Sequence, residues 1–327
     1  MLPELFHIPF LNIPIYGYGL MLVLGFLGYI AISKFMARRA GINPELFVNA
    51  AIWGLIAGIA GARASHVIEN WPDYSNGAFV ENFLHMINLR EGGLTFYGGF
   101  LLAAPIVIGY GIYQRVPLRK GMDIVAIGLM IGLGFGRIGC YLNGCCYGEE
   151  CAWGVRFPYY SDAYREQFQK REIIPQNPAL LTPLADSGDA VILKSREEVR
   201  REGLTALARQ EKANPVQPTQ LYSSFNAFLI AALLFFYFWK PHAWGRTFAW
   251  MLILDGSSRY ILEMIRVEPP LNPHLFGPLS IAQVTAVALV LAGIALWFIF
   301  GWYASTSGEQ FGDYAAIPGK APAGVAG

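Results

Sequence analysis

The sequence predicts an all-α polytopic membrane protein with about seven transmembrane helices. Composition is the first reason: of 327 residues, 54% are hydrophobic and 14% are charged, whereas soluble globular proteins carry roughly 25% charged residues. The distribution of charge is the second reason, because 21 of the charged residues lie at positions 147–213. The remainder of the chain therefore has the composition of a membrane protein. A net charge of +1 without long basic runs also argues against a nucleic-acid partner.

The third reason is a series of long intervals that lack Asp, Glu, Lys and Arg, since a membrane-crossing helix needs about 20 apolar residues. Five such intervals predict spans one, two, three, five and seven: residues 5–33, 46–62, 92–114, 213–239 and 269–308. Residues 122–141 and 247–266 are equally apolar but contain charges, and they predict spans four and six. The first interval is too long for a signal-peptide core of about 7–15 residues, so we interpret it as a retained span.

Loop charges predict the orientation, because Lys and Arg concentrate in cytoplasmic loops. They follow spans one, three and five: Lys34, Arg38, Arg39, Arg115, Arg119, Lys120, Lys240 and Arg246. The N-terminus is then outside and the C-terminus cytoplasmic. Residues 1–147 hold helices one to four, and residues 148–215 form a polar extracytoplasmic insertion between helices four and five. Residues 216–304 hold helices five to seven, and residues 305–327 form a disordered cytoplasmic tail.

The insertion is predicted to have structure of its own. Ser195 followed by Glu198 is a capping-box pattern, which is typical of a helix start. It predicts a polar surface helix from residue 196 to about residue 212.

Charged side chains inside predicted spans are costly and usually serve a function. Arg137 lies in span four, and Asp255, Arg259 and Glu263 follow one another at intervals of four in span six. This spacing places the last three on one helical face, where Glu263 is predicted to pair with Arg259.

Counting along the helices puts the arginines of three spans at a similar depth, near the outer side. They are Arg63, Arg137, Arg259 and Arg266, with only Asp255 and Glu263 as acidic partners. Guanidinium groups bind phosphate oxygens in bidentate geometry, so the cluster indicates a site for an anionic lipid headgroup. The alternative is that these arginines extend to the interface and form structural pairs.

Two glycine-rich stretches accompany the charges. One includes Gly132, Gly134, Gly136 and Gly139 beside Arg137, and the other covers residues 92–99, which read GGLTFYGG. Glycine permits close approach of a ligand or of a neighbouring helix, and both interpretations remain open. The second stretch indicates a re-entrant or tightly packed entrance to span three.

Residues 136–148 read GRIGCYLNGCCYG. This stretch resembles the signature of the prolipoprotein diacylglyceryl transferase family, Gly-Arg-x-Gly-Asn-Phe-x-Asn-x-Glu-x-x-Gly, at both flanking glycines, the Arg, the inner Gly and the second Asn. Other blocks are similar in the same order: residues 18–21, 61–63, 92–99, 218–222 and 259–266. The resemblance covers about residues 14–302.

The resemblance implies a multi-pass enzyme of the bacterial plasma membrane, with its active site toward the extracytoplasmic side. Such an enzyme transfers the diacylglyceryl group of phosphatidylglycerol to the lipobox cysteine thiol of a preprolipoprotein. The reaction forms a thioether and releases glycerol phosphate, and it is the first step of lipoprotein maturation. The implied partners are phosphatidylglycerol, the preprolipoprotein and membrane lipids, with no cofactor and no metal.

Carried over residue by residue, the resemblance and the charge analysis assign catalytic roles to Arg137, Arg259, Glu263 and Tyr97. The substrate-binding residues are Tyr18, Arg63, Gly98, Asn143, Gln220, Tyr222 and Arg266. The chain departs from the family at three positions: Tyr97 replaces a His, Cys140 an Asn and Cys145 a Glu. Because that His has been proposed as the base, removal of the thiol proton has no assigned acceptor. We expect Tyr97 to hydrogen-bond the headgroup.

The four cysteines, Cys140, Cys145, Cys146 and Cys151, lie within twelve residues. One or two disulfides are one interpretation, because disulfides persist in an oxidising compartment. Metal ligation and a reactive catalytic thiol are the others, although adjacent cysteines without a nearby His fit ordinary zinc spacing poorly.

Two other functions remain open. A transporter also buries charged residues, but it would distribute them through the membrane depth and show repeats. A related lipid-group transferase with a different acceptor would keep the arginines and tolerate the three departures.

Overall fold

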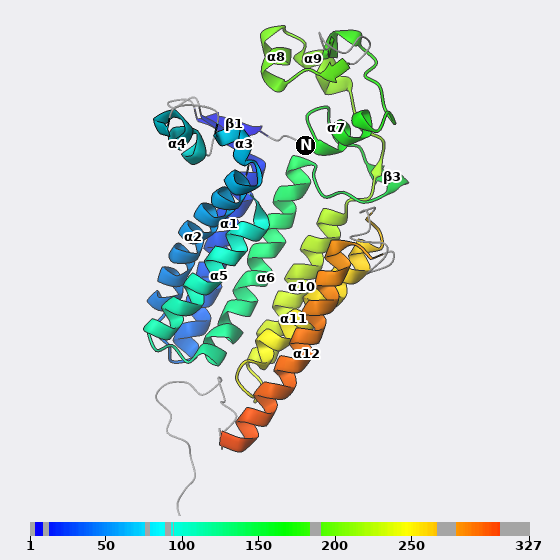
Figure 1. Cartoon of the computed structure of the whole chain (residues 1–327). Coiled ribbons are helices and arrows are strands. Elements are labelled where there is room, and N and C mark those ends of the chain that lie inside the picture. Colours follow the sequence, from blue (N-terminus) through cyan, green and yellow to red (C-terminus); the bar gives the residue numbers. More distant parts are fainter. Residues whose placement is uncertain are drawn as a thin grey trace, which may run out of the picture. The chain divides into compact units, whose positions relative to one another are not determined.

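The computed structural model describes residues 4–8, 13–75, 79–88, 93, 95–183, 191–266 and 279–307. Each predicted span coincides with a helix (Figure 1). The long helices are α1 (Gly17–Arg39), α2 (Glu45–Glu69), α5 (Phe96–Tyr113), α6 (Leu118–Asn143), α10 (Thr219–Phe238), α11 (Arg246–Glu263) and α12 (Ile281–Ser307).

Five of these helices are long and apolar enough to cross a membrane. They are α1, α2, α6, α10 and α12. The apolar part of α5, Tyr97–Tyr113, is shorter, and α11 carries the charged residues of predicted span six. The polytopic membrane class predicted from the sequence is consistent with these helices, whereas the number seven remains a prediction.

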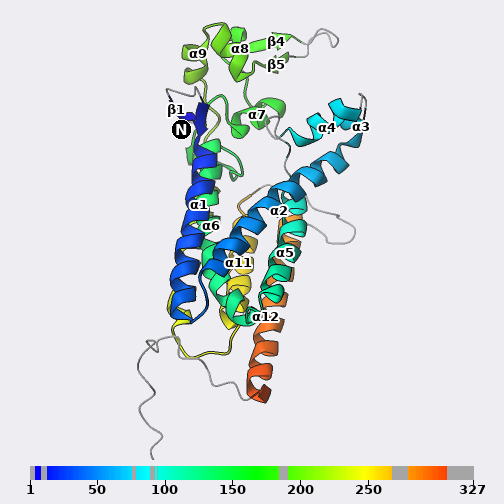
Figure 2. The same ribbon diagram turned by 90° about the vertical axis from the view of Figure 1, so that its left-hand side faces the viewer.

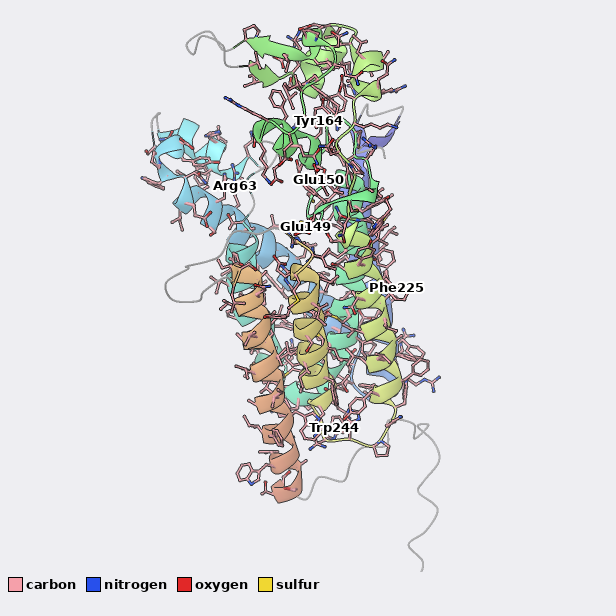
Figure 3. All side chains as sticks on the ribbon, turned by 90° about the vertical axis from the view of Figure 1, so that its right-hand side faces the viewer. Arg63, Glu149, Glu150, Tyr164, Phe225 and Trp244 are labelled. Atoms are coloured by element: carbon pink, nitrogen blue, oxygen red, sulfur yellow. The ribbon has the colours of Figure 1, made fainter. Side chains whose placement is uncertain are left out.

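The helices present large apolar side chains on their outer faces. Phe225 on α10 points away from the helices (Figure 3) and is 72% exposed, and Leu101 on α5 is 71% exposed. Large apolar side chains are exposed on each of the long helices, which fits a lipid environment.

The chain forms two compact units. The first contains Met1–Gly28, Leu129–Phe235 and Ala249–Phe298, and the second contains Tyr29–Gly128, Phe236–Phe248 and Ile299–Gly327. The helices α1, α6, α10, α11 and α12 contribute one part to each unit, whereas α2 and α5 belong to the second unit alone. The units are described separately below.

In the first unit, polar contacts join neighbouring helices within the apolar surroundings. The Ser224 hydroxyl on α10 donates to the Gly134 carbonyl on α6 at 2.9 Å, and the Asn226 amide donates to the Ser258 hydroxyl on α11 at 2.7 Å. Interhelical hydrogen bonds of this kind satisfy polar groups that lipid could not. They hold α6, α10 and α11 in the register that positions the candidate site.

The polar segment after α6 belongs to the first unit and has its own hydrophobic core. Its elements are β3 (Glu150–Val155), α7 (Asp162–Gln169), the 3-10 helix η2 (Pro178–Leu180), β4 (Leu181–Pro183), β5 (Val191–Leu193), α8 (Arg196–Arg201) and α9 (Thr205–Gln210). The strands β4 and β5 pair antiparallel, as Figure 2 shows. The fully buried aromatic residues Phe157, Tyr159 and Tyr164 are at the centre of this core.

The predicted capping box is confirmed, but the helix that it opens is shorter than predicted. The Ser195 hydroxyl accepts from the Glu198 N–H, and the Glu198 carboxylate accepts from the Ser195 N–H. The helix ends at Arg201 because the chain turns at Gly203, whose φ is +72°. Glycine adopts this left-handed conformation without steric cost, so two short helices replace the single predicted one.

The second unit is built on close packing of α2 against α5 (Figures 1 and 2). A Cβ atom at Gly98 would lie 2.2 Å from the Ser65 Cβ atom and 2.6 Å from the Gly61 carbonyl oxygen. Only glycine allows the two helix backbones to approach this closely. Gly98, predicted to bind substrate, therefore has a packing role in this structure.

Several elements were not predicted from the sequence. They are the antiparallel strands β1 (Glu4–Ile8) and β2 (Ile13–Tyr16), and the short helices α3 (Trp71–Tyr74) and α4 (Phe79–Ile87). The predicted disordered tail is wrong for its first three residues, because α12 continues to Ser307, where hydroxyls bond to carbonyls of the preceding turn. The rest of that tail, and the predicted outer connection between spans six and seven, lie outside the described residues.

Candidate active site

Arg137 lies near the C-terminal end of α6, where small residues let other helices approach. A Cβ atom at Gly139 would lie 3.0 Å from the Tyr18 ring on α1 and 3.4 Å from the Tyr18 carbonyl oxygen. This close approach brings Tyr18 into electrostatic contact with Arg137. Tyr18 is 41% exposed, so its ring forms part of an accessible surface beside the arginine.

The charged residues of α11 have different partners from those predicted. Glu263 is 3% exposed, and the ion pair that the structure gives it is with Arg266, at 3.4 Å between Nη1 and Oε2. The Ser280 hydroxyl also donates to its Oε1 at 3.5 Å. The predicted pair of Glu263 with Arg259 is not formed, because Arg266, one turn beyond, reaches the carboxylate instead.

Arg137 and Arg259 share one acidic neighbour. Asp255, half-buried on α11, interacts electrostatically with Arg259 on its own helix and with Arg137 on α6. Within the described part of the chain, neither guanidinium group donates a hydrogen bond or approaches a carboxylate to within 4.0 Å. Two half-buried cations therefore interact with the same carboxylate, and among the described residues their hydrogen-bond donors have no partner.

Two guanidinium groups and one carboxylate leave an excess of positive charge in this region. Lipid tails cannot accept hydrogen bonds from the guanidinium donors. A partly buried guanidinium group without a partner is costly, and an anion with several oxygen atoms would remove that cost. The arrangement can therefore bind a phosphate and stabilise negative charge that develops on it. From the sequence, Asp255 was considered only as a counter-ion. Its interaction with arginines of two different helices, α6 and α11, is a feature of the folded chain that residue spacing does not indicate.

The loop after α6 is anchored by the start of α10. The Gln220 amide donates to the Cys145 carbonyl at 2.7 Å, and the Thr219 hydroxyl donates to the Cys146 carbonyl at 2.8 Å. Gln220 is fully buried and Thr219 is 1% exposed. Gln220, predicted to bind substrate, thus holds the loop in place. Thr219 was not predicted as a site residue, although it lies in residues 218–222, which resemble the family.

Asn143 and Tyr222 lie at the edges of this region. The exposed Asn143 amide donates to the Asp162 carboxylate of α7 at 3.4 Å. Tyr222 on α10 is half-buried and lies in electrostatic contact with Cys151. Both substrate-binding roles remain predictions.

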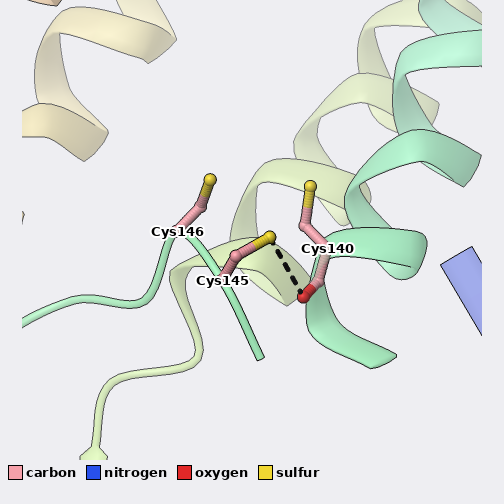
Figure 4. Close-up of side chains that lie close together, drawn as sticks. All are labelled: Cys140, Cys145 and Cys146. Atoms are coloured by element: carbon pink, nitrogen blue, oxygen red, sulfur yellow. Dashed lines mark hydrogen bonds between the residues drawn. The ribbon is translucent and has the colours of Figure 1, made fainter. Parts of the chain in front are cut away.

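Three of the four cysteines form a cluster, and all four are free thiols in the structure. The Sγ atoms of Cys140, Cys145 and Cys146 all lie within 4.8 Å of one another (Figure 4). The neighbouring thiols of Cys140 and Cys145, followed by the guanidinium groups of Arg266 and Arg137, lower the pKa of the Cys146 thiol. Cys151 is not a member of the cluster.

The second unit contains the remaining predicted site residues. Arg63 is 6% exposed, and its guanidinium donates to the carbonyls of Met86 and His85, each at 2.8 Å, and of Gly93 at 3.3 Å. Two of these carbonyls belong to the last turn of α4, where a cation is favourable. This bonding accounts for the buried charge of Arg63 without a phosphate.

Tyr97, predicted to contact the headgroup, is 55% exposed at the start of α5. The preceding Thr95 binds α2 through its N–H to the Ala62 carbonyl at 3.1 Å and through its hydroxyl to the Glu69 carboxylate at 3.2 Å. The start of α5 is therefore tightly packed, as one of the two interpretations of the glycine-rich stretch predicted, although Gly92 and Leu94 lie outside the described residues.

Together, the helices and the site define a polytopic membrane protein with partly buried arginines among its helices. The family model for prolipoprotein diacylglyceryl transferase matches residues 3–299, and the chain belongs to this family. The resemblance read from residues 136–148 is therefore confirmed.

Curated relatives agree with the family assignment. A phosphatidylglycerol–prolipoprotein diacylglyceryl transferase of Clostridium tetani is 28% identical over 300 residues, which cover 92% of this chain and 97% of the relative. One of Xanthomonas oryzae pv. oryzae is 26% identical over 294 residues, covering 87% and 86%. One of Rhodopirellula baltica is 32% identical over 169 residues, which cover 50% of this chain but only 34% of that relative.

Proposed function

We propose that this protein transfers the diacylglyceryl group of phosphatidylglycerol to the lipobox cysteine thiol of preprolipoproteins. Its family and the shared name of its curated relatives support a transferase of this kind, with a phosphatidylglycerol donor and a prolipoprotein acceptor. The single observation that carries the proposal is the pair of partly buried arginines, Arg137 and Arg259, which both interact electrostatically with Asp255.

In the proposed reaction, the arginines act on the leaving group, which is the phosphate. The acceptor sulfur attacks a glyceryl carbon, the new bond is a thioether, and the bond from that carbon to the phosphate oxygen breaks. The electron pair of the broken bond goes to that oxygen, so glycerol phosphate leaves with increased negative charge. Guanidinium donors held in place by the helices stabilise this charge in a site of low dielectric constant. No tetrahedral oxyanion forms, so an acyl-transfer triad is not required.

The acceptor thiol must also lose its proton, because the thiolate is the nucleophile. The cationic surroundings of Arg137 and Arg259 favour that ionisation without a dedicated base. Glu263 is less suited to accept the proton, since its carboxylate is paired with Arg266 and hydrogen-bonded by Ser280.

The other residues predicted from the sequence are proposed to have supporting roles in the same reaction. Tyr18 and Asn143 would contact the donor lipid beside Arg137, and Tyr97 would hydrogen-bond the headgroup. The remaining substrate-binding residues are Arg63, Gly98, Gln220, Tyr222 and Arg266. Arg63, Gly98 and Gln220 also make structural contacts within the protein. Any role in substrate binding would therefore be additional to these contacts.

The topology that supports this reaction has seven spans, with α5 and α11 as the third and the sixth. The N-terminus and the polar segment 148–215 lie outside the cytoplasm, and the C-terminus lies inside. The enzyme is then a multi-pass protein of the bacterial plasma membrane whose site opens toward the extracytoplasmic side. The charge bias of the loops supports this orientation.

A direct assay tests the reaction. Purified protein is incubated with phosphatidylglycerol and a synthetic lipobox peptide, and the peptide mass is measured. We expect a peptide that has gained one diacylglyceryl group, and no gain for a peptide in which serine replaces the cysteine. Phosphatidylethanolamine offered in place of phosphatidylglycerol serves as the donor control.

The same assay separates the competing functions. Consumption of phosphatidylglycerol with release of glycerol phosphate, but without modification of the peptide, would indicate a transferase with a different acceptor. An unmodified peptide and intact lipid, under conditions in which a known family member is active, would contradict the proposal.

A further inference from the structure

The three clustered cysteines are brought together by the end of α6. The Cys140 carbonyl accepts the N–H groups of Gly144 at 2.9 Å and Cys145 at 3.2 Å, which closes the helix end on itself. Gly144 has φ +79° and Cys146 has φ +58°, so the chain reverses direction at these residues. The reversal returns Cys145 and Cys146 to the last turn of the helix, beside Cys140 (Figure 4).

The loop is held in this position by α10. The carbonyl groups of both loop cysteines are hydrogen-bonded, Cys145 by the Gln220 amide and Cys146 by the Thr219 hydroxyl. Because both donors are buried, these bonds are shielded from competing solvent. The backbone that carries the thiols is therefore fixed before any ligand binds.

The sulfur atoms are spaced closely enough to bind one ion. All three Sγ atoms lie within 4.8 Å of one another, and zinc–sulfur bonds of about 2.3 Å in a tetrahedral site place sulfur atoms somewhat under 4 Å apart. Rotation of the cysteine side chains covers this difference. Thiolate ligands select soft and borderline metal ions such as Zn²⁺ and Cu⁺ over Mg²⁺ and Ca²⁺.

The surroundings suit a metal–thiolate group. Three thiolates and one divalent ion carry a net charge of −1, and the guanidinium groups of Arg137 and Arg266 interact electrostatically with Cys146. Gln220 Oε1 is buried and has no hydrogen-bond partner in the described part of the chain. A water molecule in the fourth position of a three-thiolate site could donate to that oxygen.

We propose that Cys140, Cys145 and Cys146 form a three-thiolate site for a soft or borderline metal ion of the Zn²⁺ class, with its fourth position open. Cys151 lies outside the site although it is in the same short stretch of chain. The proposal does not rest on the proposed function, because metal binding is measured without any transfer reaction.

The experiment uses the full chain in detergent, reduced and freed of metal, with Zn²⁺ alone as the probe. We expect one equivalent of Zn²⁺ to remain after gel filtration, as measured by elemental analysis. The single variants C140S, C145S and C146S are each expected to bind at least tenfold more weakly, whereas the matched variant C151S binds like the wild type.

A measurement on the wild type makes the test independent of how the variants fold. Alkylation of the folded protein, followed by peptide mass analysis, should show that Zn²⁺ protects Cys140, Cys145 and Cys146 but leaves Cys151 reactive. Equal alkylation of all four thiols with and without Zn²⁺ would overturn the proposal. So would substoichiometric zinc in the reduced wild type, or a disulfide within the cluster that persists under reducing conditions.

Discussion

Replacement of Arg137 by alanine, and separately of Arg259 by alanine, should each lower the rate of diacylglyceryl transfer by about 10²- to 10³-fold, or about 2.7–4 kcal/mol. The reason is that each guanidinium group is partly buried and has no hydrogen-bond partner among the residues that the structure describes, so its donors are available to the departing phosphate. The measurement is the single-turnover rate with phosphatidylglycerol and a lipobox peptide.

Two control variants make this result specific. R209A removes an exposed arginine from α9 and should leave the rate unchanged. R137K keeps the charge but not the planar, bidentate donor set, so it should recover only part of the lost rate. All variants must be present in the membrane fraction at wild-type amounts. Wild-type rates in both alanine variants would contradict the assigned role of the arginines.

The variant D123A should markedly lower the temperature midpoint of unfolding in detergent, with a loss of about 3 kcal/mol or more in stability. Asp123 on α6 is fully buried in the second unit. Its carboxylate accepts the Gly245 N–H at 2.7 Å and the Phe248 N–H at 3.0 Å, which are donors at the start of α11. The His242 ring lies 3.6 Å from the same carboxylate.

The size of this effect follows from what remains after the substitution. Without the carboxylate, one buried and one partly buried N–H group at a helix start lose their acceptor. The favourable charge at that end of the helix dipole is lost as well. D73N, at an exposed position in α3, is the matched control and should unfold like the wild type. An unchanged midpoint for D123A would show that the start of α11 does not depend on this carboxylate.

The sequence was sufficient to predict the seven long helices, because long apolar segments can be recognised from local composition. Residues 122–141 and 247–266 coincide with α6 and α11 although both contain charges, since most of the remaining side chains in each are apolar. The strands β1 and β2 and the short helices α3 and α4 were missed because short elements depend on contacts that a local pattern does not contain. The same reason explains why the helix from Ser195 was predicted too long, although its start was predicted correctly.

The site could be predicted only in part. Residue types and helical spacing indicated Arg137, Arg259 and Asp255, since charge within an apolar span is informative by itself. The hydrogen-bond and ion-pair partners of these side chains could not be predicted. They depend on which neighbouring group lies within bonding distance in the folded chain. Glu263 is paired with Arg266 and not with Arg259, and Arg63 is bonded to the end of α4. Gln220 holds the cysteine loop through a backbone carbonyl, which no spacing rule indicates.

The most direct test of the central claim is a double-mutant cycle for R137A and R259A in the transfer reaction. If both guanidinium groups bind the same departing phosphate, they act as a unit, and the double variant should be little slower than the slower single variant. If the two rate losses multiply fully, the arginines act independently, and a shared phosphate site between α6 and α11 is contradicted.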